Sequence, residues 1–195
     1  MTKHLLYLLL ACLPGNTAFS QRPGLEQYNI VWTTQSRNAS ESMPCGGGDI
    51  GMNVWVENGD VMIYLARSGS FNEHNALMKA GRLRIKLFPN PFAGEQFRQE
   101  LKLQEGFVAI TGKHAGVAAT IQIWADVFRP IVHIELQSNK AIRTEAAYES
   151  WRYQDRVVQQ RENFGNSYKW VAPKDNVYLK DIISFDNNRV LFYHH

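Results

Sequence analysis

The sequence predicts an all-β fold, an antiparallel β-sandwich of the supersandwich kind with one short helical insertion. Apolar residues alternate with other residues over positions 50–57 and again over 60–65, which is the pattern of half-buried strands, and Trp55 falls on the polar side of the first strand. Asn58-Gly59 suits the hairpin turn between them, because both central residues of a type I′ turn need positive φ. One hairpin with one apolar face is not stable alone, so we expect a second layer of strands to cover it.

β-Forming runs recur along the rest of the chain, with turn residues between consecutive runs. Such close spacing favours antiparallel sheets packed face to face over alternating β-α units. Besides the central hairpin, we predict strands at residues 28–33, 83–88, 97–104, 107–111, 117–127, 131–137, 141–148, 178–185 and 189–193.

Two segments leave this regular pattern. In residues 68–81, Asn72 suits a helix cap and Gly81 a helix stop, which predicts the single helix of the domain at residues 73–80. Residues 149–173 are polar, show no sustained period and are rich in aromatic side chains. We expect them to form a long excursion over a sheet face, and long structured loops often carry function.

Residues 1–20 are predicted to be a secretory signal peptide. A basic start precedes an apolar run at residues 5–13, and Ala18-Phe19-Ser20 has the small-x-small pattern of a cleavage site. The apolar run is too short to span roughly 30 Å of hydrocarbon as a helix. We therefore predict a secreted or periplasmic β-sandwich domain that comprises residues 21–195.

A lipoprotein anchored through Cys12 is the alternative localisation. We favour the soluble product, because the apolar segment before Cys12 is short and the later cleavage site is the better match. Without the signal peptide the chain keeps one cysteine, Cys45, and forms no internal disulfide.

The charge pattern indicates neither a nucleic-acid partner nor a membrane partner. The formal net charge is +3, and acidic residues are interspersed with basic ones along the chain. A nucleic-acid or anionic-membrane surface would show a basic run or stripe.

The sequence contains no recognisable catalytic or cofactor-binding pattern. Paired carboxylates cannot be identified from spacing, and we expect Asp49, Glu73 and Asp126 to be solvated or turn-capping. Glu73-His74 has no second histidine in reach, and the neighbours His194-His195 would point to opposite faces of a strand. The triple glycine after Cys45 lacks the lysine of a phosphate-binding loop. We predict no catalytic residue, no metal and no cofactor in this chain.

The aromatic residues of the two irregular segments give the most specific functional hypothesis. Sugars stack their C–H faces on aromatic rings while nearby polar groups bind the hydroxyls. Both segments combine these residue types, and the candidate carbohydrate-binding residues are Asn72, Glu73, His74, Trp151 and Tyr153. The alternative is that both segments only cap the sandwich or pack against another domain.

Several motifs resemble a known family. They are MPCGGGDIGMNVWVENGD (residues 43–60), GRLRIKLFPNPF (81–92), FRQEL (97–101) and RPIVHIE (129–135). They resemble the N-terminal domain of a secreted bacterial family of unknown function, numbered 5703, which is similar in turn to glycoside hydrolase family 95 and its relatives. In that family the glycine-rich segment usually reads PLGNGDIG, whereas Cys45 and Gly47 stand here in place of the leucine and the asparagine.

The resemblance implies a large β-sandwich that precedes an (α/α)6 catalytic barrel. The barrel, which holds the catalytic acids of the relatives, is not within these 195 residues. Two functional hypotheses follow. The chain is the non-catalytic N-terminal β-sandwich of a secreted glycoside hydrolase-like protein that acts on carbohydrates, or it is a stand-alone carbohydrate-binding or interaction module. The reading frame downstream of His195 distinguishes them.

Overall fold

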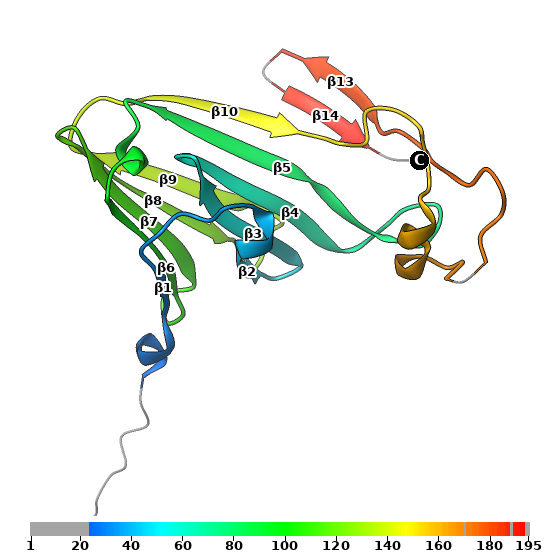
Figure 1. Cartoon of the computed structure of the whole chain (residues 1–195), viewed down its shortest axis with the longest axis horizontal. Coiled ribbons are helices and arrows are strands. Elements are labelled where there is room, and N and C mark those ends of the chain that lie inside the picture. Colours follow the sequence, from blue (N-terminus) through cyan, green and yellow to red (C-terminus); the bar gives the residue numbers. More distant parts are fainter. Residues whose placement is uncertain (1–23, 170, 188, 194–195) are drawn as a thin grey trace, which may run out of the picture.

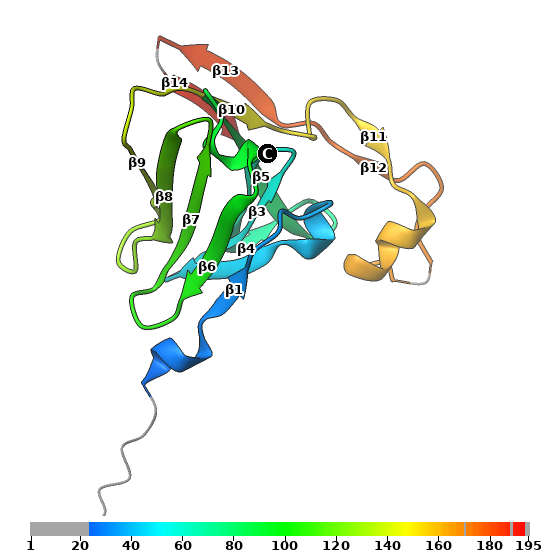
Figure 2. The same cartoon turned by 60° about the vertical axis from the view of Figure 1, so that its left-hand side comes forward.

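The structure is a computed structural model that describes residues 24–169, 171–187 and 189–193, and its main body is a pair of facing antiparallel sheets (Figures 1 and 2). In the described residues, sheet I has the strand order β1-β6-β7-β8-β9 and sheet II has the order β10-β5-β4-β3-β2. The predicted all-β sandwich is therefore confirmed. The predicted signal peptide, residues 1–20, lies outside the described residues.

The strands of each sheet come from separate parts of the chain. Sheet I contains β1 (Ile30–Trp32), β6 (Gln96–Lys102), β7 (Phe107–His114), β8 (Val117–Ala125) and β9 (Val132–Ser138). Sheet II contains β2 (Met43–Gly47), β3 (Ile50–Glu57), β4 (Asp60–Phe71), β5 (Leu77–Phe88) and β10 (Arg143–Glu149). Two small sheets pair β11 (Arg156–Val157) with β12 (Val177–Tyr178) and β13 (Ile182–Asp186) with β14 (Arg189–Tyr193). The 3-10 helices are η1 (Leu25–Tyr28), η2 (Ala39–Glu41), η3 (Pro91–Ala93) and η4 (Gln160–Gly165).

The central hairpin forms as predicted. β3 and β4 pair in antiparallel register, with Glu57 opposite Asp60 at the turn. Asn58 and Gly59 have φ values of 52° and 81°, so both central residues occupy the left-handed region that a type I′ turn requires.

The hydrophobic core lies between the two sheets and is built from alternate residues of each strand. Along β8, for example, buried and half-buried residues alternate without a break. Each fully buried aliphatic side chain contributes about 1.5–3 kcal/mol, so this layer supplies the main stabilisation. The fully buried aliphatic members are Val54, Val56, Val61, Ile63, Leu87, Val108, Ile110, Ile121 and Ile123.

Trp55 departs from the simple alternation. It was predicted on the polar side of its strand, yet its side chain is 0% exposed. The segment between β1 and β2, which includes η2, lies across the outer face of sheet II at β3 (Figures 1 and 2). The indole Nε1 donates a hydrogen bond to Glu57 Oε2 at 3.0 Å, so its polar atom is satisfied. At β3 both faces of sheet II are therefore covered.

The predicted helix at residues 73–80 is wrong. β4 runs to Phe71 and β5 begins at Leu77, so residues 72–76 form the turn of a long hairpin. Asn72 does cap a turn, because its Oδ1 accepts hydrogen bonds from the backbone N–H of His74 at 3.0 Å and of Ala76 at 2.9 Å. The same side-chain chemistry serves helix caps and Asx turns, and the residues that follow pair with β4 instead of coiling.

The β4–β5 hairpin extends beyond the sandwich. β4 and β5 are each 12 residues long, whereas β6, β7, β8 and β9 have 7 to 9 residues, and the far end of the hairpin projects past sheet I (Figure 1). The excursion, residues 150–181, leaves sheet II after β10 and folds around this end instead of spreading over a sheet face (Figures 1 and 2). One contact between them is the hydrogen bond from Ser167 N to His74 O, at 2.9 Å.

The β13–β14 hairpin packs on sheet II after the excursion. The ring of Phe192 in β14 stacks on Tyr148 in β10, with ring centres 4.5 Å apart and an angle of 20° between the planes. The Tyr148 hydroxyl donates to the carbonyl of Ala80 in β5. Burial raises the pKa of Tyr148 to about 12, so this hydroxyl keeps its proton at neutral pH.

A polar side chain links the two sheets inside the core. Gln99 of β6 is 1% exposed, and its Nε2 donates a hydrogen bond to the carbonyl oxygen of Val54 in β3 at 3.1 Å. A buried amide is tolerated only where it is hydrogen-bonded, so the bond fixes how the sheets face each other at this point.

Replacement of Gln99 tests this link. Gln99→Ala removes the inter-sheet hydrogen bond and leaves a cavity, and we expect the free energy of unfolding to fall by about 2 kcal/mol. Gln96→Ala is the matched control, because Gln96 lies on the same strand with an exposed side chain, and its effect should stay within about 0.5 kcal/mol. Urea unfolding followed by tryptophan fluorescence measures both, and equal losses would contradict the assignment.

Candidate functional site

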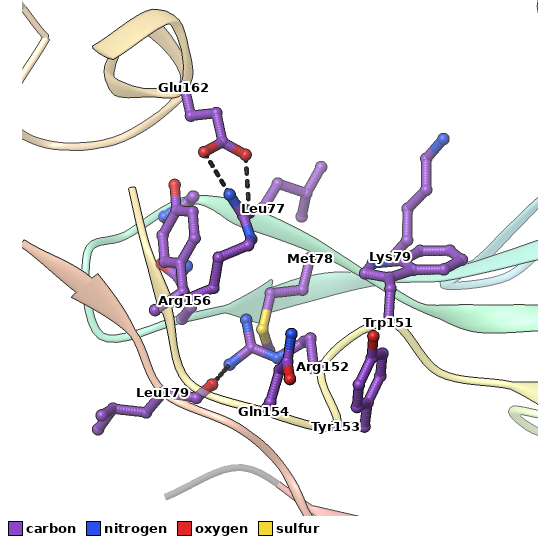
Figure 3. Close-up of a pocket in the computed structure, with 13 residues that line it drawn as sticks. Leu77, Met78, Lys79, Trp151, Arg152, Tyr153, Gln154, Arg156, Glu162 and Leu179 are labelled. Atoms are coloured by element: carbon purple, nitrogen blue, oxygen red, sulfur yellow. Dashed lines mark hydrogen bonds and ion pairs between the residues drawn. The ribbon is translucent and has the colours of Figure 1, made fainter. Parts of the chain in front are cut away.

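The excursion and the tip of the β4–β5 hairpin enclose a pocket of about 550 Å³, hereafter the cleft (Figure 3). Three of the predicted carbohydrate-binding residues, Asn72, Trp151 and Tyr153, line it, whereas Glu73 and His74 do not. The lining residues are Asn72, Ala76, Leu77, Met78, Lys79, Trp151, Arg152, Tyr153, Gln154, Arg156, Glu162, Tyr178 and Leu179.

Trp151 is held by a row of aromatic rings. Its ring meets Tyr64 of β4 edge to face, with centres 5.6 Å apart, and Tyr64 in turn meets the buried Trp55 with centres 4.7 Å apart. Edge-to-face pairs of this kind are worth about 0.5–1.5 kcal/mol beyond the area that they bury. Trp151 remains 45% exposed, so its indole is fixed in orientation while much of it stays open to a ligand.

Tyr153 stands beside Trp151 at one end of the cleft (Figure 3). Its side chain is 63% exposed. The two rings give this end an apolar character, while Gln154 and the cationic residues of the cleft supply hydrogen-bond donors.

Glu73 and His74 bind the excursion to the hairpin tip. Glu73 Oε1 accepts a hydrogen bond from the backbone N–H of Leu179 at 2.8 Å. His74 Nε2 lies 2.9 Å from the carbonyl oxygen of Val177, to which it donates as the Nε2–H tautomer. Both side chains are therefore engaged with the protein's own backbone, and their predicted contact with sugar stays a prediction.

Arg152 continues this network. Its guanidinium pairs with Asp181 at 2.8 Å and donates to the carbonyl oxygen of Leu179 at 3.0 Å, and Glu73 lies 3.9 Å away. The side chains of Arg152 and Asp181 are only 14% and 8% exposed, so this pair is partly desolvated and fixes the base of the excursion.

The opposite end of the cleft is closed by an ion pair. Arg156 donates two hydrogen bonds to Glu162 of η4, both 2.8 Å long (Figure 3). The guanidinium also lies over the ring of Tyr178, 5.3 Å from its centre. The hydrogen bond from Arg156, opposed in part by burial, lowers the pKa of Glu162, so this carboxylate stays ionised at neutral pH.

Among the described residues that line the cleft, the single carboxylate, that of Glu162, is not a suitable proton donor. A general acid for glycoside cleavage is a carboxyl group whose pKa is raised. Glu162 has a lowered pKa, and Glu149, two residues before Trp151, has one too, because Arg84 and Arg82 hydrogen-bond to it. Aromatic faces, amides and cations in a concave site suit non-covalent recognition.

The carboxylates predicted near turns have structural partners. Asp126 Oδ1 accepts from the backbone N–H of Phe128 at 2.8 Å and caps the β8–β9 turn, as expected. This hydrogen bond is the main reason why the pKa of Asp126 is lowered. Asp49 is exposed to solvent, as expected, and also pairs with Arg67 at 2.6 Å.

Cys45 is not placed for nucleophilic chemistry. It is partly buried against the core, and burial raises the pKa of its thiol to about 11, so it is protonated at neutral pH. In the described part of the chain, no group of three or more His, Cys, Asp or Glu residues could hold a metal ion. Within the same residues, no helix has the length and apolar character needed to cross a membrane.

The network around Glu73 makes a direct prediction. Glu73→Ala removes the acceptor of the Leu179 N–H, so we expect cleavage of residues 171–181 by a nonspecific protease to speed up about tenfold, with global unfolding free energy changed by less than about 1 kcal/mol. Glu105→Ala, in the exposed β6–β7 turn, is the control. Unchanged protease resistance would show that this contact does not hold the excursion.

The comparisons with known proteins identify a family but no activity. A family model for an N-terminal domain, described as "Domain of unknown function (DUF5703)", matches residues 31–195. No curated protein matches the chain.

Proposed function

Because the chain belongs to the DUF5703 family, whose N-terminal domain it matches over most of its length, we propose that it is the non-catalytic β-sandwich of a secreted glycoside hydrolase-like protein. In this proposal residues 1–20 direct export, an (α/α)6 barrel outside these residues carries the chemistry, and the cleft contacts carbohydrate.

One observation carries the proposed contact with carbohydrate. Trp151 is 45% exposed although Tyr64 fixes its ring, and Tyr153 stands beside it in a concave site with amide and cationic neighbours. An aromatic ring needed only for packing would be buried further, whereas a sugar needs an open ring with hydrogen-bonding groups nearby. A preorganised ring also lowers the entropy cost of binding.

The proposal that the chain itself is non-catalytic rests on its carboxylates. Glu162 and Glu149 are ionised by arginine neighbours, and Glu73 and Asp181 are engaged with Arg152 and the backbone. The lowered pKa values make Glu162 and Glu149 poor proton donors, and the contacts of Glu73 and Asp181 are structural.

The purified chain should therefore not hydrolyse aryl-glycosides. We expect release of p-nitrophenol from a panel of such substrates to stay at the buffer rate between pH 4 and 8. Turnover that survives repurification and disappears in Glu162→Gln would contradict this, and Glu105→Gln controls for a general loss of charge.

The Trp151 platform is tested by substitution. Trp151→Ala should weaken binding of the best oligosaccharide found on a glycan array by about tenfold, because a stacked ring is worth on the order of 1 kcal/mol, with the melting temperature nearly unchanged. Trp124→Ala is the matched control, since Trp124 lies on β8 of sheet I, where it stacks on His133. Calorimetric titration measures the affinity of each variant, and thermal unfolding measures its stability. If Trp151→Ala lowers the melting temperature and leaves the affinity unchanged, Trp151 is a packing residue.

A stand-alone carbohydrate-binding or interaction module is the second candidate. The self-contained core of the sandwich favours it, because the described residues bury a complete layer between the sheets. A reading frame that continues into helical repeats after His195 supports the first candidate, and a stop codon there supports the second.

A further inference from the structure

Lys79 differs from the other cations of the cleft. Arg152 is paired with Asp181, and Arg156 with Glu162. Among the ion pairs between described residues, none includes Lys79. Its positive charge is therefore not neutralised by a carboxylate of the described chain.

The position of the Lys79 ammonium is nevertheless defined. Nζ lies 4.2 Å from the centre of the Tyr64 ring, a cation–π contact. The same Tyr64 ring holds Trp151 edge to face at 5.6 Å. One ring thus positions both the cation and the indole.

The charge balance of the cleft is positive. Its lining residues include Lys79, Arg152 and Arg156 but a single carboxylate, that of Glu162, which Arg156 already engages. A negative group on a ligand would meet an unneutralised ammonium there, whereas a neutral ligand would gain nothing from it.

We propose that the cleft selects anionic glycans, namely oligosaccharides that carry carboxylate or sulfate groups. The sugar ring lies on the open part of Trp151, and its anionic group faces Lys79. This inference rests on the proposed function and adds the substrate class to it.

Matched pairs of glycans test the selectivity. Tetragalacturonate and its carboxyl-reduced neutral counterpart differ only in the carboxylates, and a sulfated galactan tetrasaccharide and its desulfated form differ only in the sulfates. We expect at least one anionic member to bind about tenfold more tightly than its neutral counterpart and to weaken as NaCl rises from 50 to 500 mM. The two pairs show which anion is preferred.

Substitution of Lys79 tests whether its ammonium group causes the preference for anionic glycans. Lys79→Met keeps the apolar stem and removes the charge, so it should lose the tenfold preference and most of the salt dependence, while Lys79→Arg retains both. Lys113→Met, on β7 of sheet I, is the control for loss of one exposed lysine charge. Thermal unfolding of each variant checks that it folds. If a variant does not fold, the salt dependence of binding by the unsubstituted protein still tests the preference for anionic glycans.

The outcomes separate this inference from the proposed function. Binding of neutral glycans that Trp151→Ala abolishes and Lys79→Met leaves unchanged overturns the anionic selectivity alone. Absence of binding to the four probes and to every member of a glycan array overturns both proposals.

Discussion

The excess length of the β4–β5 hairpin is the constraint from which the rest of the structure follows. At about 3.3 Å per residue, 12-residue strands reach roughly 40 Å, well past the shorter strands of sheet I. The projecting end has no facing sheet to bury it, so the chain supplies a cover from residues 150–181. That cover does not close completely on the hairpin, and the space left between them is the cleft.

The cover is held by polar contacts at its ends and by the aromatic contact of Trp151 with Tyr64 near its start. Glu73 and His74 bind the backbone of β12 and its neighbours, while Arg152 and Asp181 join the two ends of the excursion. Partly buried pairs of this kind give orientation more than net stability, because desolvation offsets much of their Coulomb attraction. The stability of the domain comes from the core between the sheets, and these contacts decide where the excursion lies.

The fold was predictable from the sequence where neighbouring residues alone determine the structure. Alternation over residues 50–57 and the Asn58-Gly59 turn specify the central hairpin without reference to the rest of the chain. Two expectations went wrong for reasons that lie far along the sequence. Trp55 is buried because the segment before β2 crosses the outer face of sheet II, and residues 77–80 are extended because β4 offers them a partner. Neither partner is encoded in the local pattern.

The candidate site was predictable only in part. The mixture of aromatic and polar residues marked both segments that form the cleft, and Asn72, Trp151 and Tyr153 line it. The roles of Glu73 and His74 were not predictable, since their partners lie 106 and 103 residues away in the chain. Lys79 was missed because it was assigned to a helix, where nothing would have placed it over Tyr64.

The separation of the core from the cleft has a consequence for variation among relatives. None of the residues that line the cleft belongs to the hydrophobic core cluster of the described chain. A substitution at an exposed lining residue such as Tyr153 therefore leaves the packing between the sheets intact, and its effect on folding stays small. If the cleft binds a ligand as proposed, single changes at the exposed lining positions can alter its specificity at little cost in stability. In that case the sandwich serves as a scaffold whose stability does not depend on the exposed residues of the cleft.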